Sequence, residues 1–162
     1  MNELLFTIFL GLSILSTGVV AGTVFAYGNS VMPGLKHADD RTFVLSIRHL
    51  TSSVANPMFL MFSNGALVTQ IGFVILAIIL QKSNAVILGS VALVFYVATL
   101  LITFLGNLPL NKAIINADIP TNDSKWNELR VQFESRWTFW NHARTITCII
   151  SVSLIILALL IN

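Results

Sequence analysis

Four long apolar segments limit what this chain can fold into more than any other feature. They cover residues 4–26, 58–80, 85–105 and 140–161. The only charged residue in them is Arg144, near the start of the fourth. Each segment has about the 20 apolar residues that a helix needs to cross the hydrocarbon core of a bilayer. Charged residues make up only 10% of the chain, against about 25% in soluble domains. The sequence therefore predicts an all-α integral membrane four-helix bundle, with residues 1–162 forming a single membrane domain.

The joints between the spans predict two further helical parts. Residues 81–84 read as a tight turn, which makes the second and third spans an antiparallel pair. The first long joint contains an amphipathic helix over residues 41–54. Asp39–Asp40 is its predicted N-terminal cap, because acidic side chains are favourable at the positive end of the helix dipole. The second long joint predicts a helix that begins at Lys125, is capped by Ser124 and extends into the fourth span.

The distribution of cationic residues predicts the orientation in the membrane. With four spans, both long joints lie on one side and both termini on the other. Of the nine lysines and arginines, only Lys82 lies on the side of the termini. The positive-inside rule therefore places both long joints in the cytoplasm and both termini outside. The lipid bilayer is the expected partner, and the sequence leaves oligomerisation open.

A few residues within the spans predict helix contacts. Gln70 lies near the middle of the second span and predicts an interhelical hydrogen bond, since an amide in hydrocarbon needs a partner. Gly18 and Gly22 stand four residues apart and predict a close approach of another helix, within the bundle in preference to a dimer face. The single cysteine, Cys148, lies in an apolar run and is expected to be buried and unreactive.

Two polar clusters interrupt this apolar background. Residues 136–144 bring two arginines, a histidine, an asparagine and two tryptophans to the start of the fourth span. Residues 106–111 place two asparagines around Pro109 at the end of the third span. Polar groups at membrane depth are costly unless partnered, so such clusters indicate a functional site. Because the topology puts both clusters on one side of the membrane, we expect them to face each other.

Helical spacing divides the later cluster into separate faces. Asn141 and Arg144 share one face of the helix, together with a tryptophan one turn earlier, whereas His142 is directed away. An ordinary aromatic belt with snorkelling arginines is the alternative interpretation, and we favour it for Trp126 and Arg136. A belt explains neither the amide of Asn141 nor its spacing to Arg144.

Histidines are the remaining candidates for chemistry. His142 is a candidate general base, because imidazole accepts a proton near neutral pH. No metal-ligand spacing occurs, so a metal or haem site would have to be assembled from His49, His142 and scattered amides, and we expect none. Phosphate-binding, dinucleotide-binding and nucleophile-elbow motifs are also missing from the sequence. The net charge of +2 is too small and the cations too dispersed to predict nucleic acid as a partner.

The residues of both clusters resemble the anthrone oxygenase-like family of small four-helix membrane proteins. The Asn-x-Pro-Leu-Asn and Trp-Asn-His-x-Arg pieces are fairly specific in combination, and the resemblance covers essentially the whole chain. Residues 46–54 match least well, which leaves the roles of Arg48 and His49 open. The matching stretches are Val31-Met32-Pro33-Gly34-Leu35, Asn56-Pro57-Met58-Phe59, Gly106-Asn107-Leu108-Pro109-Leu110-Asn111, Trp126 and the run from Arg136 to Thr145.

This resemblance implies an oxygenase that converts polycyclic aromatic anthrones to anthraquinones without a bound cofactor. Removing a proton from an activated ring carbon yields an electron-rich enolate, which reacts with dioxygen directly. The protein then supplies a base, donors for the enolate oxygen and a dry, flat pocket. The resemblance implies His142 as the base, the polar groups of Arg144, Asn141, Asn107 and Asn111 around the oxygen, and Trp137 and Trp140 stacked on the rings.

The alternative from another class is a non-catalytic membrane protein. Such a protein would bind a lipid or a quinone, or form a subunit of a larger assembly. A family likeness is weak support for any one substrate, because function depends on the site and not on the fold. The two hypotheses differ in whether the polar residues of the two clusters line one cavity.

Overall fold

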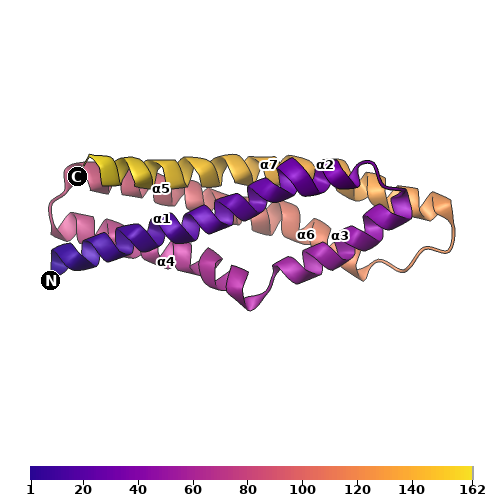
Figure 1. Cartoon of the computed structure of the whole chain (residues 1–162), viewed down its shortest axis with the longest axis horizontal. Helices are drawn as coiled ribbons and strands as arrows, with labels where there is room; N and C mark the ends of the chain where they lie inside the picture. Colours follow the sequence, from indigo (N-terminus) through magenta and orange to yellow (C-terminus); the bar gives the residue numbers. More distant parts are fainter. Residues whose placement is uncertain (162) are drawn as a thin grey trace.

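The computed structural model describes residues 1–161, and within that range every regular element is a helix (Figure 1). Four helical units are long and apolar enough to cross a membrane. They cover Asn2–Leu35, Pro57–Ile79, Ser83–Asn116 and Asp123–Leu160. The predicted all-α four-helix class is therefore confirmed, and each predicted span coincides largely with one of these units. The first, third and fourth units extend beyond the predicted spans, because each continues without a break into the long joints.

The first and third units are built alike. Each consists of a long α-helix, a short π-helical segment and a further α-helix. Their parts are α1 (Asn2–Ala26), η1 (Tyr27–Val31) and α2 (Met32–Leu35), and α5 (Ser83–Ile102), η2 (Thr103–Asn107) and α6 (Leu108–Asn116). The other helices are α3 (Asp40–Val54) in the first long joint, α4 (Pro57–Ile79) and α7 (Asp123–Leu160).

The four long helices form a closed ring. α1 packs on α4 and on α7, and α5 packs on α7 and on α4. Figure 1 shows both chain ends at one end of the molecule and α3 and α6 toward the other. The predicted grouping of the termini opposite the two long joints is therefore observed. The sidedness of the membrane stays a prediction.

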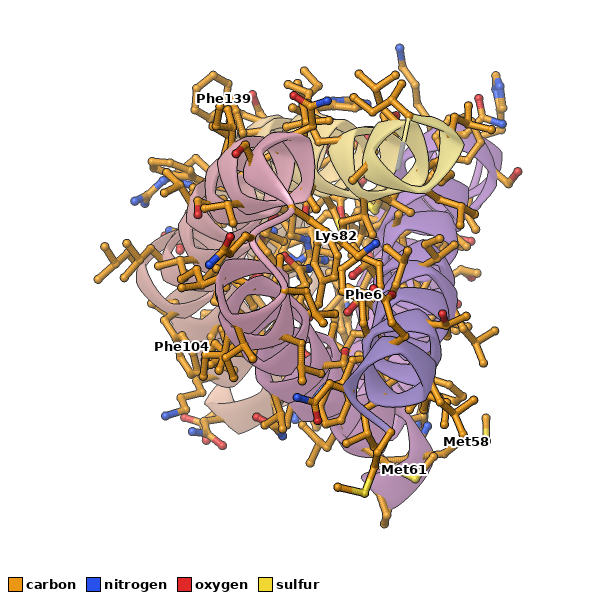
Figure 2. The ribbon with its side chains drawn as sticks, turned by 90° about the vertical axis from the view of Figure 1, so that its left-hand side faces the viewer. Phe6, Met58, Met61, Lys82, Phe104 and Phe139 are labelled. Carbon is orange, nitrogen blue, oxygen red and sulfur yellow. The ribbon has the colours of Figure 1, made fainter. Side chains whose placement is uncertain are left out.

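A few buried polar side chains link the helices of the ring across its interior. Gln70 is fully buried, and its amide Nε2 donates to the hydroxyls of Thr17 at 2.9 Å and Ser151 at 3.3 Å. Ser151, on α7, donates to the carbonyl oxygen of Ala92 on α5 at 2.9 Å. The predicted interhelical role of Gln70 is confirmed. Many large apolar side chains point outward, as Met58, Met61, Phe104 and Phe139 do in Figure 2.

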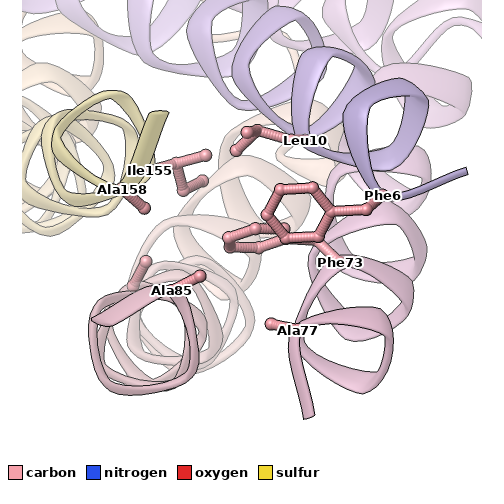
Figure 3. Close-up of a cluster of buried hydrophobic side chains, with 8 residues drawn as sticks. Phe6, Leu10, Phe73, Ala77, Ala85, Ile155 and Ala158 are labelled. Atoms are coloured by element: carbon pink, nitrogen blue, oxygen red, sulfur yellow. The ribbon is translucent and has the colours of Figure 1, made fainter. Parts of the chain in front are cut away.

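An apolar cluster closes the bundle near the termini (Figure 3). Phe6 and Phe73 lie with ring centroids 5.4 Å apart, and alanines of α4, α5 and α7 complete the cluster. Lys82, in the turn between α4 and α5, lies 5.1 Å above the Phe6 ring and forms an ion pair with Glu3 at 3.4 Å. None of the residues of the two polar clusters lies in this apolar cluster. The candidate site therefore lies toward the opposite end of the bundle.

The glycines at which neighbouring helices come close are not the ones that the sequence predicted. No atom lies within 4 Å of a methyl group placed on Gly18 or Gly22, so neither brings a neighbouring helix close. That prediction is wrong. A methyl group on Gly72 would overlap the Phe9 ring, and one on Gly89 would lie 2.6 Å from the Phe73 ring. Which glycine faces a neighbour depends on the rotation of each helix, which spacing alone does not determine.

The helix α3 confirms the amphipathic prediction. Phe43, Val44 and Ile47 are fully buried on one face, while the opposite face is exposed. Asp39 caps the helix: its carboxylate accepts the Thr42 backbone N–H at 2.9 Å and the Thr42 hydroxyl at 2.7 Å. These two hydrogen bonds lower the pKa of the Asp39 carboxyl, the backbone bond contributing most. The carboxylate is thereby kept charged at the positive end of the helix.

The long helix α7 joins the bundle to the layer formed by α3. A helix of 38 residues is about 57 Å long, whereas the hydrocarbon core is about 30 Å thick. The first part of α7 therefore extends beyond the core and packs on α3. Trp126 is buried in that contact, so the aromatic-belt interpretation of Trp126 is wrong. The cap is Asn122, whose side chain accepts the Lys125 N–H at 3.0 Å, and not Ser124 as predicted.

Candidate functional site

Two π-helical segments interrupt the first and third units at the same level as the polar clusters. In each segment the hydrogen bonds skip one residue more than in an α-helix: Met32 N–H bonds to the Tyr27 carbonyl, and Leu108 N–H to the Thr103 carbonyl. A proline follows each segment by two residues, at Pro33 and Pro109. Proline lacks an N–H and crowds the preceding turn, so the regular ladder cannot continue through it. Such π segments often lie at functional sites.

A glycine in each π segment lets these units approach α7 closely. A methyl group on Gly28 would lie 2.8 Å from Asn141 Nδ2, and one on Gly106 would lie 2.5 Å from Trp140 Cγ. The end of the first unit and the end of the third unit therefore press against the same turn of α7. This contact aligns the three helices around the residues that follow.

Trp137 joins the two polar clusters. Its indole Nε1–H donates to Asn111 Oδ1 at 2.7 Å, and its backbone carbonyl accepts from Asn107 Nδ2 at 3.2 Å. Trp137 and Asn107 are almost completely buried, whereas Asn111 is partly exposed. The expectation that the two clusters face each other is confirmed by these hydrogen bonds.

The indole of Trp137 also carries an aromatic and cationic stack. The Phe133 ring lies 5.8 Å from it at an interplanar angle of 22°, and the Tyr27 ring lies 6.0 Å from it at 51°. The Arg144 guanidinium lies 5.6 Å from the Trp137 ring centroid. Side chains from α7 and from the end of the first unit therefore meet on one indole, which the hydrogen bond to Asn111 holds in place.

Arg144 is a partly buried cation without an anionic partner. Its Nε and Nη2 groups donate to Asn141 Oδ1 at 3.1 and 2.9 Å. Asn141 is itself fixed, because its Nδ2 donates to the Val24 carbonyl at 3.0 Å. Among the described residues 1–161, no carboxylate forms an ion pair with Arg144 and no hydrogen bond engages its Nη1. Buried charges are ordinarily paired, so this guanidinium is available to an anionic group.

A small cavity lies beside this guanidinium, where α1, α3, α4, α6 and α7 meet. Its volume of about 30 Å³ is enough for a water molecule or two. Hydroxyl, indole, amide and guanidinium groups lie on its wall among apolar side chains. The residues that line it are Thr23, Val24, Tyr27, Thr51, Val54, Phe59, Asn111, Trp137 and Arg144.

The structure brings three of the seven predicted site residues to this cavity, namely Asn111, Trp137 and Arg144. Asn141 lies behind Arg144 and Asn107 lies behind the backbone of Trp137, both fully buried. These two side chains hold the lining residues in position without lining the cavity themselves.

The other two predicted site residues lie elsewhere. Trp140 packs against Gly106 and stands edge-on to Phe139, with ring centroids 5.3 Å apart. His142 is exposed and lines a separate open groove that it shares with Lys36 and Glu134. The helical spacing already directed His142 away from Arg144, and the structure agrees.

The histidines do not assemble into a metal-binding cluster. His49 is exposed on α3, and it does not line the groove that contains His142. Within residues 1–161, no three side chains of histidine, cysteine, aspartate or glutamate gather as metal ligands would. The neighbouring Arg48 has a structural role instead: its Nη1 and Nη2 donate to the carbonyls of Ala117 and Ile115, both at 2.7 Å.

Sequence reasoning missed Tyr27, Thr51 and Phe59 as cavity residues. Tyr27 follows the first span directly, where a tyrosine is ordinarily an interfacial anchor. Thr51 lies on the buried face of α3, and Phe59 lies one turn into α4. Tyr27 is the first residue of the π segment and precedes Pro33 by six residues, which is the one sequence signal that distinguishes it from an ordinary interfacial tyrosine.

The fold and the site together define a class: a small four-span membrane protein with a cation-containing cavity at one end of its bundle. The family model described as anthrone oxygenase matches residues 55–154, well over half of the chain. The chain belongs to the anthrone oxygenase family. No curated protein and no solved structure matches it. The matched region contains α4, α5, α6 and most of α7, and therefore Asn111, Trp137 and Arg144, but not Tyr27.

Proposed function

We propose that this protein is a membrane-embedded oxygenase that oxidises a lipophilic, anthrone-like aromatic substrate with dioxygen through a deprotonated enolate. The site is the cavity bounded by Tyr27, Trp137 and Arg144. Membership of the anthrone oxygenase family supports the substrate class. The bundle's lipid-exposed apolar surface supports access from the membrane, where such a substrate would partition.

The observation that carries this proposal is the unpaired guanidinium of Arg144 at the cavity wall. When a proton leaves the activated ring carbon, negative charge develops on the ketone oxygen of the substrate. A fixed cation in a water-poor site stabilises that charge far more than water does, and it needs no reorganisation during the reaction. Asn141 holds the guanidinium in place through its two hydrogen bonds, so the donor is positioned before the substrate arrives.

Dioxygen is the only electron acceptor that the overall reaction requires. One methylene carbon of the substrate loses both hydrogens and gains a carbonyl oxygen, while the second oxygen atom leaves as water. Dioxygen takes up four electrons, of which two come from each C–H bond. The aromatic faces of Trp137 and Tyr27 would stack on the substrate rings.

The cavity must open to admit such a substrate, because its present volume of about 30 Å³ holds only a water molecule or two. Val54 and Phe59 line it from either side of the short connection between α3 and α4. We propose that the substrate enters by displacing this connection.

Oxygen uptake with an anthrone tests the proposal. Purified protein in lipid nanodiscs is expected to consume oxygen above the spontaneous rate and to form one anthraquinone for each dioxygen. Arg144→Gln, which removes the charge that stabilises the enolate, should lower kcat by about 100-fold or more. The matched control is Arg136→Gln, since Arg136 is exposed on the same helix and does not line the cavity.

Two results would overturn the proposal. Wild-type protein that binds an anthraquinone but consumes no oxygen with any anthrone would indicate the alternative, a non-catalytic quinone-binding or lipid-binding protein. An Arg144→Gln variant as active as the Arg136→Gln control would show that the guanidinium does not stabilise the transition state.

A further inference from the structure

We propose that Tyr27 is the residue that removes and returns protons in this cavity. The inference rests on the proposed function and assigns its general base and acid. It places the proton transfer on a tyrosine at the end of the first span, outside the part of the chain that the family model matches.

The position of Tyr27 relative to the other cavity groups supports this role. Its side chain lines the cavity together with Arg144, and its ring packs against the Trp137 indole at 6.0 Å. Its hydroxyl donates to the backbone carbonyl of Leu50 at 3.3 Å, a long hydrogen bond that is readily exchanged for one to a substrate. Arg144 and Tyr27 also lie within electrostatic range of each other.

The other groups on the cavity wall are poorly suited to proton transfer. Apart from Tyr27, the only ionisable side chain that lines it within the described residues is Arg144, on α7. A guanidinium remains protonated and cannot act as a base. α3, α4 and α6 contribute only apolar, hydroxyl and amide side chains to the wall. His142 lines the separate groove and not this cavity.

The neighbouring guanidinium offsets part of the cost of forming a phenolate at this partly buried position. A phenolate beside a fixed cation is stabilised by their Coulomb attraction, which is strong where water is scarce. The same cation then stabilises the substrate enolate once the proton has moved to Tyr27. Negative charge is thereby transferred from one partner of Arg144 to another, and the cavity keeps the same net charge throughout.

The proton transfers balance over one turnover. The Tyr27 phenolate takes one proton from the methylene carbon, and the C–H electron pair forms the enolate. The enolate gives one electron to dioxygen, and the two radicals combine to form the C–O bond of a peroxide anion, which takes the proton back from Tyr27. The phenolate then removes the second hydrogen of that carbon. Its electron pair forms the carbonyl as the O–O bond breaks, and the departing hydroxide receives the proton from Tyr27 and leaves as water.

The test compares the only two tyrosines of the chain. Tyr27→Phe removes the proposed base and keeps the ring that packs on Trp137. Tyr96→Phe is the matched control, because Tyr96 is buried in the bundle and donates to the Ser63 carbonyl at 2.7 Å. Tyr27→Phe should lower kcat by about 100-fold or more, the usual share of a general base. Its affinity for an anthraquinone product should change by no more than about fivefold, the effect of one neutral hydrogen bond.

A second measurement has a readout that a structural role would not change. In the Tyr96→Phe variant, fluorotyrosine incorporation labels Tyr27 alone, and fluorination makes the phenol more acidic. The alkaline rise of kcat/KM with pH should then move to lower pH.

The outcomes separate the inference from the proposed function. Wild-type protein without oxygen uptake contradicts the proposed function, and with it the inference. Active wild-type protein together with a fully active Tyr27→Phe variant contradicts the inference alone. An unchanged pH profile after fluorotyrosine incorporation also contradicts it, even if Tyr27→Phe folds poorly.

Discussion

At the scale of single residues, Trp137 determines how the site is assembled. Its backbone carbonyl, its indole N–H and its ring face each contact a different partner. The partners come from the end of the third unit and from the next turns of α7. A tryptophan can fill all three roles at once because it combines a large apolar face with one polar edge. Replacing it would therefore disturb both polar clusters together.

Gly106 provides a residue-scale prediction about packing. A methyl group there would lie 2.5 Å from Trp140 Cγ and 3.0 Å from its Cβ, atoms at the stem of the side chain that cannot swing away. Gly106→Ala should destabilise the folded protein by about 1–3 kcal/mol, as overpacking of a core does. Thermal unfolding in detergent measures this change.

The control for Gly106 is Gly22→Ala. Gly22 lies in α1 with no atom within 4 Å of an added methyl group. Alanine favours helix by up to about 1 kcal/mol over glycine, so this variant should unfold at the same or a higher temperature. Equal destabilisation by both substitutions would contradict the close packing of Gly106 on Trp140.

At the scale of elements, the site depends on interruptions in otherwise regular helices. The π segments η1 and η2 each precede a proline and each contain a glycine that touches α7. An extra residue in a turn rotates all that follows by about 100° relative to an unbroken α-helix. Helical spacing therefore predicts faces correctly within α7, where Asn141 and Arg144 do face the bundle. It cannot predict how α2 and α6 are rotated after their π segments.

The helix α3 provides a prediction at this scale. Arg48 donates to two carbonyls, those of Ile115 and Ala117, at the C-terminal end of α6. A lysine has no planar fork and cannot bridge both. Arg48→Lys should lose about 1–3 kcal/mol of stability, the value of hydrogen bonds to a charged group. Cleavage of residues 117–122 by a non-specific protease should also become faster.

Arg41→Lys is the matched control for Arg48, since Arg41 is exposed on the same helix. It should leave both the stability and the rate of cleavage unchanged. If the two variants behave alike, Arg48 does not hold α6 in place.

At the scale of the whole molecule, the distribution of charge predicts the orientation in the membrane. Of the nine lysines and arginines only Lys82 lies at the end of the termini. The site would then open near the cytoplasmic surface, where Arg144 lies close to the layer formed by α3 and the first part of α7. Cysteine labelling can test this, because the single native cysteine, Cys148, is fully buried.

In a Cys148→Ala background, Gln81→Cys and Thr121→Cys report on opposite ends of the bundle. A maleimide that cannot cross the membrane should label Gln81→Cys in intact cells, because positive-inside topology places that turn outside. It should label Thr121→Cys only after the membrane is permeabilised. The reverse pattern would show that the long joints lie outside.

The sequence by itself determined the membrane bundle, its spans, the amphipathic α3 and the shared end of the two polar clusters. Each of these follows from a property that can be read without knowing how the helices pack. These properties are enough apolar residues to cross the hydrocarbon core, one apolar face along a helix, and an even number of spans. Only the tertiary structure decided which polar side chains share a cavity. That choice depends on the π segments and on glycine contacts between helices, which place Tyr27 beside Arg144 and leave His142 in another groove.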